Sequence, residues 1–534
     1  MDDGHAVDDL PELSRGVAYP RSMDEIVERV RRSLDPTTRE EFDRRVEAQA
    51  AVLREELREG AFDSREFSIG LELELYATDG QDRLARLPGP VFADGGCATE
   101  LGLHNAELNT EPTAFDAAGI EAQADAIAER VARARAVADE HDRALALDAM
   151  WTIPPHEGTL EYLSAVEERE GVSIAHNIRP NARYSALDAD VLEQAGGTVA
   201  IDVPGARLDL PSVLVESLAT SLQPHLQVPS SGAFPAYYNA AIRTLGPVLA
   251  LATNAPFLPA DCYEELTGSV DEPYSLVEKT HHELRVPVFE QSMNVAGAGK
   301  VRVPRDVETT TEVVDRVVAD RTCAPFLREW VAEGAPESHA DRIWEFEHKR
   351  GSYWRWLRTV LGGQPVERTC DERSLRIEYR PLPTQPSVAG VVGLQVLVAG
   401  LVRGIVAAGH PLADLDWAAA ERSFYRAVAA GLDAELAWVT AEGERTSSKE
   451  TIYGELFALA RRGLDEQGVP EATAEEYLAP IEARWAARTT PSAWKKARVR
   501  EELDAGAALP AAIAAMQREY LRLSRQDDPF VEWV

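Results

Sequence analysis

The sequence has little lysine, few cysteines and no long apolar run. Its 534 residues include only six lysines beside 49 arginines, and its four cysteines are far apart, with no Cys-x-x-Cys pair. Scattered cysteines argue against a disulfide framework or a zinc site and are typical of reduced cytoplasmic thiols. We find no uninterrupted apolar stretch of about 18 residues and therefore expect no membrane span. The acidic N-terminus lacks the features of a secretory signal, so we expect a cytoplasmic protein.

The charge of the chain is strongly negative. There are 90 acidic residues against 55 basic ones, which gives a formal net charge of −35. The acidic residues are spread along the whole chain, which favours a solvated surface adapted to high salt over a site for a cationic partner. DNA and anionic membranes are poor partners for such a charge. We therefore expect a halophilic protein that acts on small molecules, with no nucleic-acid or membrane partner, and leave self-association open.

The pattern of apolar residues predicts an α+β protein. Strict alternation predicts a strand over 67–76, and alternation also predicts strands over 106–110 and 375–380; we expect further strands over 143–150 and 221–228. Helical patterns cover 1–65, where Pro36 and the following Thr and Glu residues predict a helix start, and also 114–142, 237–253 and most of the chain beyond about 386. Strands and helices alternate without a regular βαβ order, which favours an antiparallel core with a helical C-terminal region.

Two glutamates share one face of the first predicted strand. In the segment Gly70-Leu71-Glu72-Leu73-Glu74-Leu75, side chains alternate, so Glu72 and Glu74 point one way and the leucines the other. Two carboxylates about 7 Å apart repel each other unless they are solvated or a cation lies between them. Hard cations such as Mg²⁺ prefer oxygen ligands. For this strand alone, a solvent-facing edge of an acidic protein is the simpler interpretation.

Two further segments carry acidic or metal-binding side chains. Glu107 lies in an apolar alternating context, which is unusual for a carboxylate that only contacts solvent, and Glu100 precedes it by seven residues. Surface charge is the simpler interpretation for Glu100. His225 and Gln227 would share one strand face. A lone strand histidine is usually structural, but together with carboxylates from other strands it could complete a metal or nucleotide site.

The last alternating segment places Arg376, Glu378 and Arg380 on one face. Such a stripe is either a self-neutralising set of salt bridges or a carboxylate that binds metal beside arginines that bind phosphate. Carboxylates on at least three strands, a histidine and strand arginines together suit phosphoryl transfer with several Mg²⁺ ions. The sequence has neither a P-loop nor the kinase glycine loop, so we expect any ATP to be held by a sheet and metals.

The order of these elements resembles the glutamate–cysteine ligase superfamily, especially its carboxylate-amine ligase branch. The resemblance rests on Gly70–Glu74, Glu100, Glu107, Pro180–Tyr184, His225–Val228, Leu249–Phe257 and Ile377–Leu382. It implies a curved antiparallel sheet of the glutamine synthetase type, flanked by helices. It also implies a helical N-terminal extension (1–65), a catalytic ligase domain (66–400) and a helical C-terminal region (401–534) packed on that domain. The last 90 residues look like an addition to the family.

The resemblance also implies roles for particular residues. The expected ligands of Mg²⁺, or of Mn²⁺ in its place, are Glu72, Glu74, Glu100, Glu107, His225 and Glu378. Arg380 would stabilise the transferring phosphoryl group, so that Arg380 and Glu107 are the expected catalytic residues, and Arg376 and Arg380 would contact ATP. The expected substrate-binding residues are Arg183, Arg285 and Gln227.

The resemblance implies an ATP-dependent ligase that forms an amide through an acyl phosphate. A γ-glutamyl bond, with glutamate and cysteine as substrates, is the first expectation. Two alternatives stay open: a phosphotransferase on the same fold, and a non-catalytic relative that binds a nucleotide or an amino acid. The mass of the product distinguishes the ligase from the phosphotransferase. Binding of Mg²⁺-ATP tests the non-catalytic relative.

Overall fold

The computed structural model describes residues 22–267, 271–295, 297, 299–332, 334–362 and 373–533. Its centre is a nine-stranded, curled antiparallel sheet, counted over these residues. The main path of this sheet runs through β11 (Leu357–Leu361), β12 (Leu375–Tyr379), β10 (Ser221–Gln227), β1 (Ser68–Thr78), β3 (Asn105–Asn109) and β2 (Ala98–Thr99). Short strands β4 (Thr113–Ala114), β5 (Ala144–Ala146) and β13 (Leu382–Pro383) extend it. The α+β prediction with a curved antiparallel sheet is confirmed.

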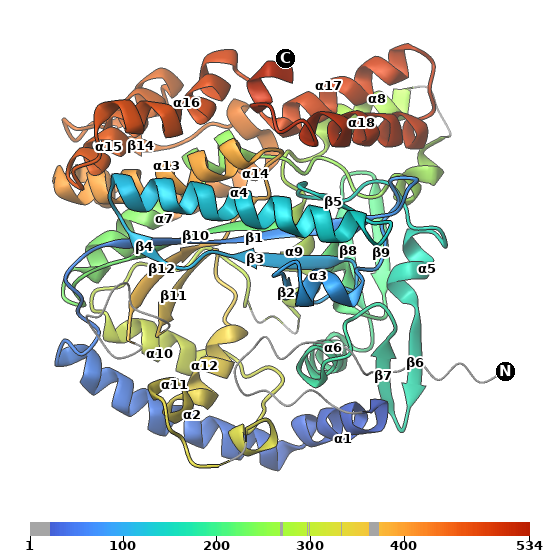
Figure 1. Ribbon diagram of the computed structural model, residues 1–534, viewed down its shortest axis with the longest axis horizontal. Helices are drawn as coiled ribbons and strands as arrows, with labels where there is room; N and C mark the ends of the chain where they lie inside the picture. Colours follow the sequence, from blue (N-terminus) through green and yellow to red (C-terminus); the bar gives the residue numbers. More distant parts are fainter. Residues whose placement is uncertain are drawn as a thin grey trace.

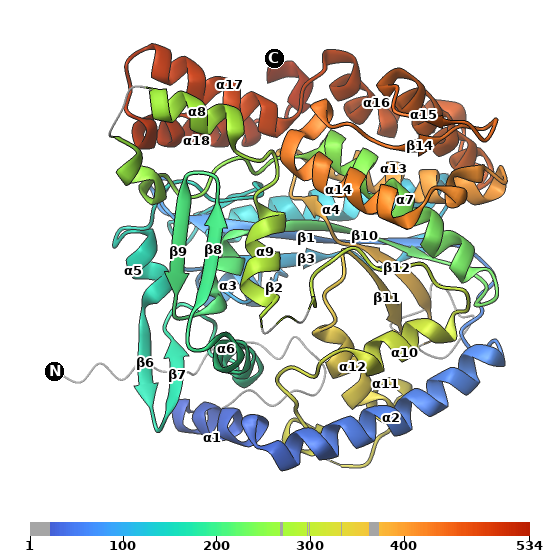
Figure 2. The same ribbon diagram turned by 180° about the vertical axis from the view of Figure 1, so that it is seen from behind.

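The two faces of the sheet have different surroundings. One face of β1 carries Leu71, Leu73 and Leu75, all at most 2% exposed. Helices α4 (Ala117–Asp139), α7 (Phe234–Ala252) and α13 (Val388–Ala407) lie above this face in Figure 1 and bury it. The other face points towards the lower half of the molecule, where α1 (Met23–Leu34), α2 (Pro36–Arg58), α10 (Thr311–Ala319) and α12 (Trp344–Gly351) lie in both views (Figures 1 and 2). Polar strand residues on this face therefore point towards the second layer of helices.

The remaining elements are short or peripheral. The other helices are α3 (Gly89–Ala93), α5 (Thr159–Ser164), α6 (Ala182–Ala195), α8 (Asp271–Lys279), α9 (Arg285–Met293), α11 (His339–Arg342), α14 (Trp417–Ala430), α15 (Lys449–Asp465), α16 (Glu471–Ala487), α17 (Pro491–Asp504) and α18 (Leu509–Ser524). Three hairpins stand apart from the main sheet: β6–β7 (Val166–Arg169, Val172–Ala175), β8–β9 (Val199–Val203, Ala206–Leu210) and β14–β15 (Trp438–Val439, Arg445–Thr446).

Helix α13 corrects the expectation about long apolar segments. Its 20 residues have a mean hydropathy of 2.0, so it is long and apolar enough to cross a membrane by length and composition, and it is the one such helix among the described residues. Gln395 and Arg403 interrupt the apolar run, and for that reason it escaped the sequence criterion. Inside the protein, 83% of its most apolar 18 residues are buried, as in the core helix of a soluble protein.

Helix α13 packs against α15 through glycines. A Cβ atom on Gly404 would lie 1.8 Å from the Leu459 carbonyl oxygen, and one on Gly463 would lie 1.9 Å from that of Gly400. Only glycine permits this approach of the two backbones, because any side chain would overlap the opposite helix. The predicted domain boundary at residue 400 falls inside this helix. The catalytic sheet and the C-terminal helices therefore share one continuous core element.

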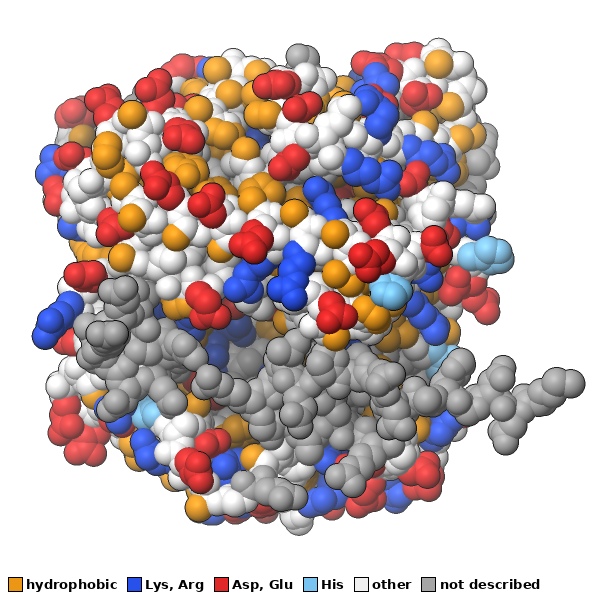
Figure 3. All heavy atoms as spheres, in the orientation of Figure 1, with side chains coloured by type: hydrophobic (Ala, Val, Ile, Leu, Met, Phe, Trp, Pro, Cys, Tyr) orange, Lys and Arg blue, Asp and Glu red, His pale blue; other side chains and the backbone are white. Residues whose placement is uncertain are grey.

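Most predicted elements occur where the alternation placed them, with differences at their ends. The predicted strand 143–150 shortens to β5 because its later residues leave the sheet. Helix α2 starts at Pro36, as predicted, but its N-cap is Asp35, whose carboxylate accepts a 2.8 Å hydrogen bond from the Thr37 amide. On the face in Figure 3, acidic side chains are scattered over the described surface among basic ones. No single acidic patch dominates that face.

Candidate active site

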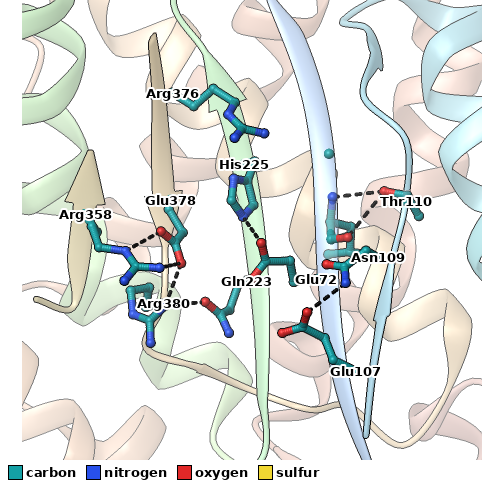
Figure 4. A network of polar contacts seen from close by, with 12 residues as sticks. Glu72, Glu107, Asn109, Thr110, Gln223, His225, Arg358, Arg376, Glu378 and Arg380 are labelled. Carbon is teal, nitrogen blue, oxygen red and sulfur yellow. Dashed lines mark hydrogen bonds and ion pairs between the residues drawn. The ribbon is translucent and has the colours of Figure 1, made fainter. Parts of the chain in front are cut away.

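The polar face of the sheet brings together side chains from five strands. Antiparallel pairing places Glu74 of β1 opposite Glu107 of β3, and His225 of β10 opposite Glu378 of β12. Side chains of directly paired residues lie on the same face of a sheet, so all four point into the space below β1. Figure 4 shows this face, with Arg358 contributed by the edge strand β11.

Glu72, His225 and Glu378 form a first triad that could hold a metal ion, because one ligand atom from each lies within 4.8 Å of the others. The His225 Nε2 atom is 3.2 Å from the Glu72 carboxylate, yet neither buried ring nitrogen makes a well-aligned hydrogen bond. Glu378 is fully buried and receives two hydrogen bonds from Arg358, at 2.6 and 2.8 Å, and one from Arg380 at 2.5 Å. Two guanidinium groups thus balance one carboxylate.

The charges of the first triad are compensated within the protein. Removal from water acts to raise the pKa of Glu378, but the attraction of Arg358 and Arg380 outweighs it and holds this pKa well below its usual range. Burial also opposes ionisation of Glu72, and here His225 reverses the effect and lowers the pKa. For Arg358, loss of solvation lowers the pKa to about 10. Glu72, Glu378 and Arg358 are therefore charged at neutral pH.

Glu74, Glu100 and Glu107 form a second triad, again with one oxygen from each within 4.8 Å of the others. Glu74 accepts hydrogen bonds from the Ser221 amide at 2.7 Å and the Ser221 hydroxyl at 2.9 Å. Glu107 accepts one from the Asn109 amide group at 2.7 Å. These neutral donors orient the carboxylates without adding positive charge to the triad.

Among the residues that the structure describes, no basic side chain forms an ion pair with the second triad. Removal from water, followed by repulsion from Glu74, raises the pKa of Glu100 to about 8. The same causes raise the pKa of Glu107 well above its usual range, with Glu72 as the largest repelling charge. Loss of solvation also raises the pKa of Glu74, although Arg285 partly opposes it. Three convergent carboxylates that repel one another fit a hard divalent cation such as Mg²⁺ or Mn²⁺.

A cavity of about 240 Å³ is lined by all three glutamates of the second triad and, from the first triad, by Glu72. Its described lining combines the glutamates of the sheet with Arg358, Arg380 and Gln223, and with apolar side chains from other elements: Leu101, Leu187, Phe289, Met293 and Trp354. Arg183 also lines it and has no ion-pair partner among the described residues. A Cβ atom on Gly351 would lie 2.2 Å from the Arg183 Nη2 atom, so this glycine leaves the space that the guanidinium group occupies.

Three of the predicted site residues neither line this cavity nor belong to a triad. Gln227 donates a 3.0 Å hydrogen bond to the Ser64 hydroxyl, at the far end of β10. Arg285 donates to the Pro381 carbonyl oxygen at 3.1 Å and pairs with a buried glutamate. Arg376 donates to the Gly362 carbonyl oxygen at 3.2 Å. The side chains of Gln227, Arg285 and Arg376 are therefore held by other groups of the protein, outside the cavity.

The structure adds three residues that sequence reasoning missed. Arg358 lies on β11, a five-residue strand too short to stand out from the sequence. Gln223 shares a face of β10 with His225 and accepts a 2.6 Å hydrogen bond from Arg380. Glu216 is the lone acid in the 3₁₀ helix Val213–Leu218, and loss of solvation followed by repulsion from Glu74 raises its pKa to about 8. A single acid in this apolar run was the signal available in the sequence.

A curled antiparallel sheet with carboxylates and arginines on one face is the architecture expected of ATP-dependent carboxylate-amine ligases. The comparisons agree: the chain belongs to glutamate–cysteine ligase family 2, whose model matches residues 68–523. Membership of this family supports the interpretation of the chain as an ATP-dependent ligase. The match extends through α15–α18, so the C-terminal helices are part of the family and the interpretation of them as an addition was wrong. Residues 1–67 lie outside the match.

Solved structures with similar folds are distant in sequence. The glutamate–cysteine ligase of Francisella tularensis, solved in complex with AMP, has a TM-score of 0.50 and 14% identity, over 87% of this chain and 90% of that one. A bifunctional glutathione synthetase from Pasteurella multocida has a TM-score of 0.45 and 11% identity, over 90% of this chain and 54% of that one. No curated protein matches the chain significantly. The likeness to the Francisella structure shows a shared fold.

Proposed function

We propose that this protein joins a carboxylate to an amine at the expense of ATP, with Mg²⁺ or Mn²⁺ at the two triads. The observation that carries the proposal is the pair of adjacent triads on one sheet face beside Arg358 and Arg380. A bound divalent ion would neutralise phosphate charge. The glutamates and His225 would hold such ions, since they offer the oxygen and imidazole ligands these metals accept.

Arg380 would stabilise the phosphoryl group that passes from ATP to the substrate carboxylate. Its guanidinium group lines the cavity and is already fixed by Glu378 and Gln223, so little ordering is needed when a charged substrate binds. Arg358 lies on the other side of Glu378 and keeps this carboxylate ionised. The fixed positive charges thus lie next to the negative triads, where phosphate oxygens can contact both.

The substrate carboxylate would accept the phosphoryl group to give an acyl phosphate, which an amine then attacks with release of phosphate. Arg183 suits recognition of a second carboxylate, as in an amino acid, because it reaches the cavity without an ion-pair partner among the described residues. Glutamate and cysteine are our first substrate pair, by analogy with the family. Arg285 and Gln227 would act indirectly, since neither lines the cavity.

The test is an assay for ADP release from Mg²⁺-ATP with glutamate and a panel of amino acids and amines, in low and in molar salt. We expect ADP release to depend on both glutamate and one of the amines, and mass spectrometry to detect the amide product. A phosphorylated product without an amide would instead identify a phosphotransferase. If neither product forms but calorimetry detects Mg²⁺-ATP binding, the protein is a non-catalytic relative and the ligase proposal fails.

A further inference from the structure

Part of the cavity wall lies away from the sheet, and the segment Asp320–Ala324 forms it together with the end of α12. Cys323 and Ala324 of the first segment line the cavity, as do His348 and Gly351 of α12. These residues complete the wall that a substrate contacts once it is bound to the triads. Their position therefore matters to any reaction in this cavity, although none of them lies on the sheet.

Ala324 has a strained backbone that its neighbours hold in place. Its φ angle is +45°, in the left-handed region that non-glycine residues rarely adopt. The Asp190 carboxylate accepts a 2.7 Å hydrogen bond from the Ala324 amide, and the His348 ring donates a 2.8 Å hydrogen bond to its carbonyl oxygen. Such conformations persist only where surrounding contacts determine them. The wall is therefore a shape that other elements impose on this segment.

Helix α2 supplies several of these contacts. The guanidinium group of Arg39 donates to the Thr322 carbonyl oxygen at 2.5 Å and to the Asp190 carboxylate at 3.2 Å. The Thr322 hydroxyl donates to Asp43, and the Lys349 ammonium group lies 3.4 Å from the same carboxylate. Thr322 and Lys349 are both 4% exposed, whereas the Asp43 side chain is 47% exposed, so the wall side of these contacts is buried and the α2 side meets solvent.

The same helix also fixes α12. The Gln49 amide donates to the Glu345 carboxylate at 2.6 Å and accepts from the Phe346 backbone amide at 2.8 Å. Arg45 adds a 2.9 Å ion pair with Glu345, which is 2% exposed. Helix α2 thus contacts both parts of the wall, the segment Asp320–Ala324 and α12. Since α2 spans Pro36–Arg58, it lies outside the residues that the family model matches.

We propose that Arg39 and Asp43 of α2 are positioning residues that set the shape of the active-site wall through Thr322 and Ala324. They touch neither the cavity nor the triads, so they act on substrate recognition through the wall. Metal binding depends on the sheet and is independent of them. The prediction about substrate recognition rests on the proposed function, whereas the prediction about the wall itself does not.

Cys323 provides a direct probe of the wall, and Cys97 an internal reference. Both thiols are buried, with 2% exposure, but Cys97 lies between α3 and β2, away from α2. Iodoacetamide labelling followed by peptide mass spectrometry gives the ratio of the two alkylation rates in the full-length chain. We expect Arg39→Ala to raise the Cys323/Cys97 ratio at least about tenfold, which corresponds to about 1.4 kcal/mol of easier local opening.

Arg44→Ala is the matched control. Arg44 lies on the same helix, but its side chain is 66% exposed and pairs only with Glu41 among the described residues. The ratio should stay at the wild-type value in this variant. An unchanged ratio in Arg39→Ala would overturn the proposal, as would an equal rise in Arg44→Ala. These results do not depend on whether the protein is a ligase, so failure of the proposed function is separable.

Kinetics add a second readout once activity is found. Arg39→Ala should raise KM for the amino-acid substrates about tenfold, with a smaller change in kcat and unchanged Mn²⁺ affinity by calorimetry. A merely structural role would instead lower the active fraction and leave KM unchanged, which would contradict the proposal. If Arg39→Ala does not fold, Thr322→Val removes only one hydroxyl group and should raise the same labelling ratio. An unchanged ratio there would also overturn the proposal.

Discussion

The two carboxylate triads lie next to each other on one sheet face, yet their charges are balanced in different ways. Glu378 is enclosed by Arg358 and Arg380, and its pKa falls well below the usual range. In the described part of the chain, Glu100 and Glu107 form no ion pair with a basic side chain, and their pKa values rise. The first triad is therefore stable without metal, whereas the second is a site whose full ionisation needs a cation. Matched substitutions in the two triads test whether their charges are balanced differently.

The largest effect should come from Glu107→Gln, which removes a ligand from the second triad without changing its size. We expect turnover to fall about 1000-fold, equivalent to about 4 kcal/mol, because the metal loses an oxygen ligand of full charge. The metal-free melting temperature should not fall, since glutamine resembles the neutral carboxyl group that the raised pKa of Glu107 favours. Steady-state assays and thermal unfolding measure both. Glu111→Gln, on an exposed neighbour, is the control and should retain wild-type activity.

The same change in the first triad should have the opposite effect on metal-free stability. Glu378→Gln leaves Arg358 and Arg380 without a buried counter-charge, so the free energy of unfolding should fall by about 3 kcal/mol. Urea unfolding in the presence of a chelator measures it. An equal stability loss in Glu107→Gln and Glu378→Gln would show that the two triads do not differ.

A smaller loss is expected for Arg358→Lys, which keeps the charge but removes the two-pronged contact with Glu378. One charge-assisted hydrogen bond fewer should lower the free energy of unfolding by about 1.5 kcal/mol. Arg376→Lys is the control on the neighbouring strand, because Arg376 donates to a backbone carbonyl group and makes no hydrogen bond to Glu378. A larger loss in the control would place the balancing charge on Arg376.

The smallest effect separates two glutamines of β10. Gln223 contacts Arg380 and lines the cavity, whereas Gln227 contacts Ser64. We expect Gln223→Ala to lower kcat/KM about tenfold and Gln227→Ala to lower it less than about threefold. If the order is reversed, the substrate extends along β10 beyond the cavity, and the sequence-based role for Gln227 regains support.

Much of the sheet, and the face on which its glutamates lie, could be predicted from the sequence, because both depend on local alternation. Glu72 and Glu74 share a face by the geometry of any strand, and resemblance to the family joined them to Glu107, His225 and Glu378. Registers such as Glu74 opposite Glu107 depend on chain folding and could not be read locally. The same limit explains Arg358, which lies on a five-residue strand and becomes significant only through its pairing opposite Glu378.

The wall of the cavity was beyond prediction for a different reason. Arg39 and Thr322 are 283 residues apart in sequence, and their contact passes between an arginine of a charged helix and a backbone carbonyl group. No periodic pattern in the sequence predicts a contact between two such distant residues. The misjudged C-terminal helices show a related limit, since Ala-rich amphipathic segments carry few family-specific residues even where the family continues through them.

Metal-dependent stabilisation of the fold is the most direct test for a cation site at the second triad. Thermal unfolding of the wild-type protein and of Glu107→Gln should be compared with chelator and with Mn²⁺ at rising concentration. At about 100 times its Kd, one bound ion should stabilise the wild-type protein by about 2.7 kcal/mol, and Glu107→Gln should gain almost nothing. An equal gain in both proteins, or no gain in the wild type, would contradict a metal site at the second triad.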